Sequence, residues 1–172
     1  MTEAGTIPLR RKPTDLPALL RGTVETLRDQ AAALDVSLSI EAPAELPQVD
    51  VDAEKIAWAV ATLVGNALRF VRRGTRLHPG GVIHVRIAAP EPGSVSIAVE
   101  DDGPGIPAEK VERLFARGKD VTHGTGLGLM LIEDVVAAHG GSVNVESKCE
   151  TLDSGTTVTM HLPVEAQTSL DV

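Results

Sequence analysis

Amide, basic and aromatic side chains recur at short intervals between residues 62 and 73. Thr62, Asn66, Arg69, Phe70 and Arg73 are separated by four, three, one and three residues, so on an α-helix they project side by side. The amide oxygen of Asn66 is the kind of ligand that Mg²⁺ prefers, Arg69 could pair with phosphate oxygens, and Phe70 could form an apolar wall for a base. A solvated polar helix face with Phe70 in the core is the plainer interpretation, and this stretch alone favours it.

A second candidate segment, residues 100–107, reads Glu-Asp-Asp-Gly-Pro-Gly-Ile-Pro and follows a predicted strand. Gly103 and Gly105 would let the backbone approach a ligand closely, and the carboxylate of Asp101 could accept a hydrogen bond from an exocyclic amine such as adenine N6. A calcium-binding loop is disfavoured because the regular ligand spacing and closing Glu of an EF-hand are missing. An ordinary Asp/Gly/Pro turn explains the segment equally well.

The third candidate segment, residues 123–129, reads His-Gly-Thr-Gly-Leu-Gly-Leu and leads into a predicted helix. Gly124, Gly126 and Gly128 would expose backbone N–H groups beside the positive end of the helix dipole, which suits phosphate oxygens. The Gly-Lys-Ser/Thr of a Walker A loop is missing, and no strand leads directly into the segment as in a Rossmann fingerprint. By itself the segment is weak evidence, since a flexible loop entering a helix would have the same composition.

The elements that must position these segments follow from the apolar periodicity. Helices are predicted over residues 15–34, from an Asp52 N-cap to about Gly74, over 108–115 and over 127–139. Alternating apolar and polar residues predict strands over 36–40, 49–51, 82–87, 95–99, 142–147 and 157–162. This mixture predicts an α/β (α+β) two-layer sandwich, in which a mixed, mostly antiparallel sheet carries about three main helices on one face.

The composition fits one soluble globular unit of 172 residues. We expect residues 1–13 to be an N-terminal linker or first edge strand, 14–164 the folded domain, and 165–172 a tail. No long apolar run or signal-peptide pattern is present, so we expect a cytoplasmic domain, whose parent protein could be membrane-anchored. The formal charge of −8 argues against nucleic-acid binding and direct membrane contact, although residues 69–86 hold five arginines and no acid.

In their order and spacing, the three segments together resemble the GHKL ATPase superfamily, and within it the catalytic domain of sensor histidine kinases. Residues 63–70 look like the N box of that family, 101–106 like its first glycine box, 114–115 like its F box and 124–129 like its second glycine box. Residues 138–141, 155–156 and 162–163 fit its closing strands. The resemblance covers about residues 16–163 and implies a Bergerat fold.

The resemblance also implies a role for each matching residue toward Mg·ATP. Asn66 would hold Mg²⁺, with Thr62 as a further candidate ligand, and Arg69 would face the phosphates, so the catalytic roles fall to Asn66 and Arg69. Asp101 would bind adenine N6, and residues 116–123 would form the ATP lid. The other expected nucleotide-binding residues are Phe70, Gly103, Gly105, Ile106, Phe115, Gly124, Thr125, Gly126, Leu127, Gly128, Leu129 and Thr156.

Two departures from the family pattern stand out. The family's N box usually begins with an Asn where this chain has Thr62, and a hydroxyl is a weaker Mg²⁺ ligand than an amide oxygen. The chaperone, topoisomerase, mismatch-repair and anti-sigma-factor kinase branches have a Glu base there, so Thr62 counts against them. The lid is also short. An alternative interpretation is therefore a degenerate nucleotide-binding module with a regulatory or partner-binding role and no phosphotransfer.

The expected phosphoacceptor is missing from the sequence. None of the five histidines has the acidic neighbour and following Arg, Thr or Pro of that site: His78, His84, His123, His139 and His161. The resemblance therefore implies the catalytic domain of a two-component sensor histidine kinase that presents the γ-phosphate of ATP to a histidine elsewhere. That histidine would lie on a helical-hairpin dimerisation and phosphoacceptor domain, in the same protein or in trans, with a response regulator downstream. A self-contained ATPase is a second rival.

Overall fold

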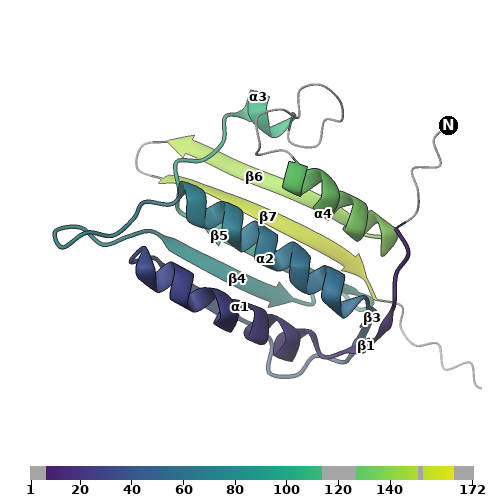
Figure 1. Cartoon of the computed structure of the whole chain (residues 1–172). Coiled ribbons are helices and arrows are strands. Elements are labelled where there is room, and N and C mark those ends of the chain that lie inside the picture. The colour runs from purple at the N-terminus through teal and green to yellow at the C-terminus, as the bar shows by residue number, and fades with distance from the viewer. Residues whose placement is uncertain (1–6, 114–126, 151–152, 165–172) are drawn as a thin grey trace, which may run out of the picture.

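The computed structural model describes residues 7–113, 127–150 and 153–164 (Figure 1). Along the chain these residues form the following elements: β1 (Lys12–Thr14), α1 (Leu16–Ala33), β2 (Ser37–Glu41), β3 (Val49–Val51), α2 (Ala53–Phe70), β4 (Val82–Ala88), β5 (Ser94–Asp101), α3 (Ala108–Val111), α4 (Leu127–Ala138), β6 (Ser142–Glu150) and β7 (Asp153–Pro163). No helix in the described ranges has the length and hydropathy needed to span a membrane.

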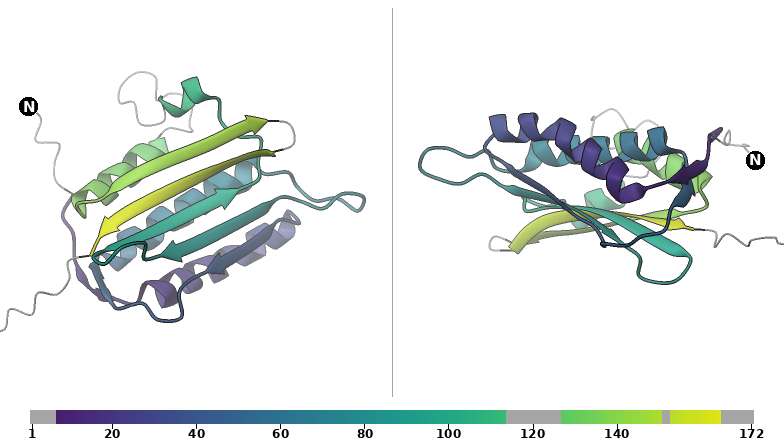
Figure 2. Two further views of the ribbon diagram at one scale, coloured as in Figure 1. Left: turned by 180° about the vertical axis from the view of Figure 1, so that it is seen from behind. Right: turned by 90° about the horizontal axis from the view of Figure 1, so that it is seen from below.

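The main sheet has the strand order β2-β4-β5-β7-β6. Strand β2 runs parallel to β4, and the other neighbours are antiparallel. The short strands β1 and β3 pair with each other in a separate two-stranded sheet. The three long helices α1, α2 and α4 lie on one face of the main sheet, and no described helix covers the other face (Figure 2). The prediction of a mixed, mostly antiparallel two-layer sandwich is confirmed.

The core lies between the sheet and the three long helices because the strands alternate and the helices are amphipathic. The buried strand residues facing the helices include Ile83, Val85 and Ile87 of β4, Val95, Ile97 and Val99 of β5, and Val158, Met160 and Leu162 of β7. Helix α2 contributes Ile56, Val60, Leu63, Val64 and Ala67 to the same core. The predicted apolar face of this helix is therefore the one that packs on the sheet.

Helix α2 is shorter than the sequence pattern predicts. The side chain of Asp52 caps its start, where Oδ1 accepts a hydrogen bond from the Lys55 amide at 3.2 Å. The helix ends at Phe70 because Val71 is extended, with φ −71° and ψ 153°. The Gly81 amide then donates to the Arg72 carbonyl at 2.7 Å, which returns the chain to the sheet. Arg73 consequently lies beyond the helix, not on the stripe that holds Asn66.

Several other boundaries also differ from the predictions. The described part of α3 ends at Val111, and residues 114–115 of the predicted helix lie outside the described residues. Strands β6 and β7 extend to Glu150 and Asp153 through backbone pairing of exposed polar residues, which carry no alternating signal. Residues 12 and 13, expected to belong to a linker or first edge strand, form β1 together with Thr14.

Candidate functional site

The last two turns of α2 carry the polar stripe that the sequence singled out. Thr62 and Asn66 are half-buried and one turn apart, whereas Arg69 is exposed and Phe70 is 49% exposed. No group in the described part of the chain forms a hydrogen bond with the Asn66 side chain. A half-buried amide that bonds none of the described residues can offer both lone pairs of its oxygen to a ligand.

Asp101 ends β5 in the middle of the main sheet, between Ile83 of β4 and Thr156 of β7. Its Oδ1 accepts a hydrogen bond from the Gly103 amide at 2.8 Å, which turns the chain sharply after the strand. A Cβ atom added at Gly103 would lie 3.4 Å from the Phe70 carbonyl oxygen and 2.9 Å from Asp101 Oδ1. The loop after β5 thus packs against the last turn of α2 and brings Asp101 to the end of the helix that carries Asn66.

The environment of Asp101 favours a ligand that donates a hydrogen bond. Burial raises the pKa of its carboxyl above the ordinary value, the Gly103 amide lowers it, and the negative charge of Asp102 raises it again. A carboxylate that is costly to ionise gains from a further donor, and Oδ1 uses only part of its acceptor capacity. An exocyclic amine such as adenine N6 would supply that donor.

Ser147 joins the loop after β5 to the neighbouring strands. Its Oγ accepts a hydrogen bond from the Ile106 amide at 2.6 Å, donates to the Gly155 carbonyl at 3.1 Å and lies 2.8 Å from the Thr156 hydroxyl. Thr156 is in turn the cross-strand partner of Asp101. The sequence did not single out Ser147, because only the β6–β7 register shows that this serine, among many, faces the loop.

Gly105 is needed where the loop passes β6. It has φ +78°, and a Cβ atom there would collide with the Lys148 carbonyl oxygen. Both the left-handed backbone and the close approach favour glycine. The backbone that Gly105 approaches is therefore that of β6, and this contact fixes the path of the loop beside Asp101.

The glycine-rich segment is described only from Leu127 onward. Helix α4 starts at this residue, packs against α2 and the strands β6 and β7, and buries Leu129 to 5% exposure. The predicted lid, residues 116–123, lies outside the described residues, as do four further predicted site residues: Phe115, Gly124, Thr125 and Gly126. The surroundings of Leu127 and Gly128 within α4 are likewise not described.

Helices α2 and α4 run antiparallel, so the start of α4 lies at the same end of the helical layer as the C-terminal end of α2 (Figure 1). The structure thus gathers Asn66, Asp101, Thr156 and the start of α4 at one end of the sandwich. An amide oxygen, a half-buried carboxylate and a helix N-terminus together suit a nucleotide, whose base donates and whose phosphates accept.

The chain was next compared with known proteins. Residues 51–166 match the family model described as "Histidine kinase-, DNA gyrase B-, and HSP90-like ATPase". The chain belongs to this ATPase family. Its curated relatives include the adaptive-response sensory kinase SasA of Synechococcus sp. (strain JA-3-3Ab), which is 30% identical over 166 residues covering 94% of this chain and 42% of SasA. The histidine protein kinase DivJ of Caulobacter vibrioides is 35% identical over 169 residues, which cover 94% of this chain and 26% of DivJ.

Solved histidine kinases share the fold of this ATPase domain. Full-length ShkA in complex with AMPPNP has a TM-score of 0.78 and 25% identity, over 94% of this chain and 32% of ShkA. The mycobacterial sensor histidine kinase MprB has a TM-score of 0.73 and 27% identity, over 90% of this chain and 98% of the MprB chain. The predicted family and fold are confirmed, and the chain spans less than half the length of SasA and DivJ.

The described residues were also inspected for groups that could hold a metal ion. Within the described ranges, no group of three or more His, Cys, Asp or Glu side chains is placed to hold an ion. The free amide oxygen of Asn66 fits Mg²⁺, which takes few protein ligands and completes its shell with water and substrate phosphates. The Thr62 hydroxyl, one turn earlier on α2, is a second available oxygen.

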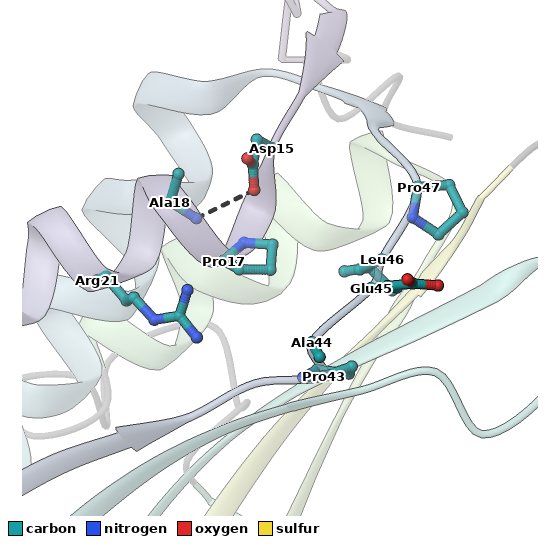
Figure 3. A pocket seen from close by; sticks show the side chains of 9 residues that line it. All are labelled: Asp15, Pro17, Ala18, Arg21, Pro43, Ala44, Glu45, Leu46 and Pro47. Carbon is teal, nitrogen blue, oxygen red and sulfur yellow. Dashed lines mark hydrogen bonds between the residues drawn. The ribbon is translucent and has the colours of Figure 1, made fainter.

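A cavity of about 560 Å³ lies elsewhere in the domain, between the start of α1 and residues 43–47 (Figure 3). Asp15, Arg21 and Leu46 are among its lining residues, and Asp15 also caps α1 by accepting from the Ala18 amide at 3.1 Å. Its walls contain none of the predicted site residues. The cavity therefore contributes nothing to the nucleotide site at the opposite end of α2.

Proposed function

We propose that this chain binds Mg·ATP and presents the γ-phosphate to a histidine on a separate helical-hairpin dimerisation and phosphoacceptor domain. The observation that carries the proposal is the packing of the loop after β5 against the backbone of Phe70, at the end of the helix that carries Asn66. The match to the ATPase family and the sensor-kinase relatives support it. An AMPPNP complex of ShkA supports a nucleotide as the ligand.

In this proposal the base and the metal bind at opposite sides of the loop after β5. The Asp101 carboxylate accepts from adenine N6, while Ser147 and Thr156 hold the strand and the loop beneath the base. The amide oxygen of Asn66 binds Mg²⁺, with Thr62 as the weaker second ligand, and exposed Arg69 faces the phosphates. When bound, Mg²⁺ neutralises charge on the phosphate oxygens.

The remaining predicted nucleotide contacts complete the site. The backbone of residues 124–129 would cradle the phosphates, Phe70 and Ile106 would border the base, and Phe115 would lie at the hinge of the lid. The domain of residues 14–164 would act in the cytoplasm, where ATP is available. Within the larger protein, it would supply phosphate indirectly to a response regulator.

The proposed reaction is a phosphoryl transfer in which the protein mainly positions the substrates. A nitrogen of the acceptor imidazole attacks the γ-phosphorus, the bond to the β–γ bridging oxygen breaks, and ADP leaves with that electron pair. The attacking nitrogen is the unprotonated one of the neutral ring, and the proton on the other ring nitrogen can pass to solvent once phosphohistidine has formed. Arg69 would stabilise the charge on the transferring group, so its loss should slow transfer more than it weakens binding.

Thr62 favours one alternative, a nucleotide-binding module without phosphotransfer. Its hydroxyl is a weaker metal ligand than the amide usual in the family, and it cannot act as the general base of a self-contained ATPase. The alternative keeps the same nucleotide site and removes only the transfer step.

One experiment separates these functions. The chain is mixed with the separately produced helical-hairpin domain of its own protein or operon and with γ-labelled Mg·ATP. Acid-labile, alkali-stable label on the hairpin supports the kinase. Nucleotide binding without protein label supports the module, whereas steady phosphate release by the chain alone indicates an ATPase. Absence of nucleotide binding overturns the proposal.

A further inference from the structure

A buried hydrogen bond joins α2 and α4 at the end of the domain opposite Asn66. Asp52 and His139 are each 4% exposed. The Asp52 amide donates to His139 Nε2 at 3.0 Å, and His139 Nδ1 lies 2.8 Å from the Val135 carbonyl oxygen. Because the amide can only donate and the carbonyl can only accept, the ring is neutral with its proton on Nδ1. We call this pair the Asp52–His139 clamp.

The carboxylate of Asp52 brings the N-terminal segment into the same cluster. Its Oδ2 accepts from the Arg10 amide at 2.9 Å and from Lys55 Nζ at 3.2 Å, while Oδ1 caps α2. Nearby, Arg11 Nη2 donates to the Ala138 carbonyl at the end of α4, at 3.1 Å. The segment before β1 is therefore bonded to both helices that carry the nucleotide site.

The clamp and the nucleotide site lie at opposite ends of the same helix pair (Figure 1). Asn66 follows Asp52 by 14 residues (66 − 52), which corresponds to ~21 Å of helix. Helix α4 has 12 residues, or ~18 Å, and runs back from His139 to Leu127. Packed helices move as rigid rods, so their relative position at Asn66 depends on how they are held at the clamp.

We propose that His139 is a positioning residue for the nucleotide site, which acts through Asp52 to set the position of the start of α4, at Leu127, relative to Asn66. This inference rests on the proposed nucleotide-binding function. It has a chemical consequence, because protonation would turn Nε2 into a donor facing the Asp52 N–H group. The clamp then opens, and nucleotide affinity falls.

The charged groups around His139 come from several elements. Asp52 and Lys55 belong to the start of α2, and Arg11 precedes β1. On β7, the backbone carbonyl of His161 lies against Gly141, and its side chain is exposed. Burial lowers the pKa of His139 from its ordinary value of 6.5; the Val135 carbonyl raises it, and the charge of Arg11 lowers it. The ring is thus neutral at pH 7 and takes a proton only in acid.

The test measures the affinity for Mg·AMPPNP by titration calorimetry between about pH 5 and pH 8, the range in which histidines titrate. His139→Gln does not titrate, and its side-chain oxygen can still accept from the Asp52 amide. His84→Gln is the matched control, because His84 lies on the uncovered sheet face and bonds Ser39 Oγ at 2.6 Å. Circular dichroism at each pH verifies that the proteins stay folded.

Below pH 6.5, the affinity of the unaltered chain and that of His84→Gln should both fall. We expect each fall to exceed that of His139→Gln by on the order of fivefold or more. Titration of the nucleotide and of Asp101 is common to all three proteins and cancels in the comparison. His139→Ala should bind on the order of fivefold more weakly at neutral pH while folded. If His139→Ala does not fold, the pH profile of His139→Gln decides alone.

Two results would overturn the positioning role: superimposable pH profiles of the unaltered chain and His139→Gln, or full affinity in folded His139→Ala. Either leaves nucleotide binding itself intact. If the unaltered chain does not bind Mg·AMPPNP at neutral pH, both the proposed function and this inference fail. The two failures are therefore distinguishable.

Discussion

Asn66 offers a direct test of the metal site. Replacing it with Ala should lower the affinity for Mg·ATP at least about tenfold, because the amide oxygen is the proposed protein ligand of Mg²⁺. Its side chain is half-buried and has no partner in the described structure, so the free energy of unfolding should change by only about 0.5 kcal/mol. Calorimetric titration with and without Mg²⁺ measures the effect.

Asn144→Ala is a suitable control for Asn66→Ala, because Asn144 is an exposed residue of β6 whose side-chain amide donates to exposed Glu146 at 3.5 Å. It should bind Mg·ATP like the unaltered chain. Equal affinities of the Asn66 and Asn144 variants would remove Asn66 from the site.

Asp101 should determine which base the site accepts. Asp101→Asn keeps the size of the side chain and one oxygen for the Gly103 amide, but it turns one acceptor into a donor that faces the exocyclic amine. We expect the preference for ATP over GTP to shrink about tenfold or more, since a site whose polar groups do not match those of its ligand binds that ligand much more weakly. Competition binding with the two nucleotides measures this ratio, and a variant that keeps the full preference would contradict the assignment.

The ATP affinity should also depend on the ionisation of Asp101. Because the pKa of its carboxyl is raised, the carboxylate is lost as the pH falls through a value above the ordinary 3.8. Affinity should fall in that range, and the fall should vanish in Asp101→Asn. The neighbouring Asp102→Asn, whose oxygen can still accept from the Val82 amide as Oδ1 does now at 2.8 Å, should keep the fall.

The sequence reveals residues whose type alone suggests their chemistry. Asn66 and Asp101 were singled out by their residue types together with the family resemblance, and their roles toward the nucleotide stay predictions. Ser147 could not be predicted, since its role comes from the register that aligns it with Thr156 and the loop amide of Ile106. The bond between His139 and Asp52 could not be predicted either, because the two residues lie 87 positions apart in the chain.

The path of the loop after β5 depends on its contact with β6. Substitutions at two glycines separate the cost of a positive φ from the cost of a steric collision at this contact. Gly105 and Gly93 both have positive φ, at +78° and +84°. A Cβ atom at Gly93 would meet only the Val164 carbonyl oxygen, at 3.5 Å, whereas at Gly105 it would collide with the Lys148 carbonyl. Gly93→Ala therefore carries the conformational cost alone, and Gly105→Ala carries that cost and the collision.

We expect Gly93→Ala to destabilise the domain by about 1 kcal/mol, and Gly105→Ala by about 1–3 kcal/mol more. Chemical denaturation measures both. Only Gly105→Ala should also weaken nucleotide binding, because it displaces the loop that holds Asp101. Equal destabilisation by the two substitutions would show that the loop can move away from β6 without a further loss of stability.

The elements with a continuous apolar period were predicted to within one or two residues, as α1 and β4 show. The end of α2 was not, because buried Val71 continues the apolar pattern although its backbone is already extended. What stops the helix is the bond between the Gly81 amide and the Arg72 carbonyl, a contact made across a loop. Similarly, the outer ends of β6 and β7 pair through exposed polar residues that carry no periodic signal.

The domain as a whole holds the proposed nucleotide site and the clamp at opposite ends of one helical layer, with the N-terminal segment bonded at the clamp. The stability of the folded chain should therefore depend on pH through the same two residues. Burial lowers the pKa of His139, so its stabilising contribution is complete above the ordinary pKa of 6.5 and is lost as the pH falls below it.

Asp52 acts in the same direction at lower pH. Burial alone would raise the pKa of its carboxyl, but the amides of Arg10 and Lys55 and the ammonium group of Lys55 together lower it below the ordinary 3.8. Its contribution is present above pH 3.8 and is lost as the pH falls through the lowered value. Two acid-induced losses of stability should thus occur, one beginning near pH 6.5 and one beginning near pH 3.8.

Urea unfolding followed by circular dichroism at a series of pH values would resolve these two losses without any nucleotide. His139→Gln should abolish the first and keep the second, while Asp52→Asn, which can still cap α2, should abolish the second. His84→Gln should show both, since its ring lies on the uncovered face of the sheet. If stability is constant between pH 7 and pH 5 in the unaltered chain, the buried His139 ring does not hold the two helices together.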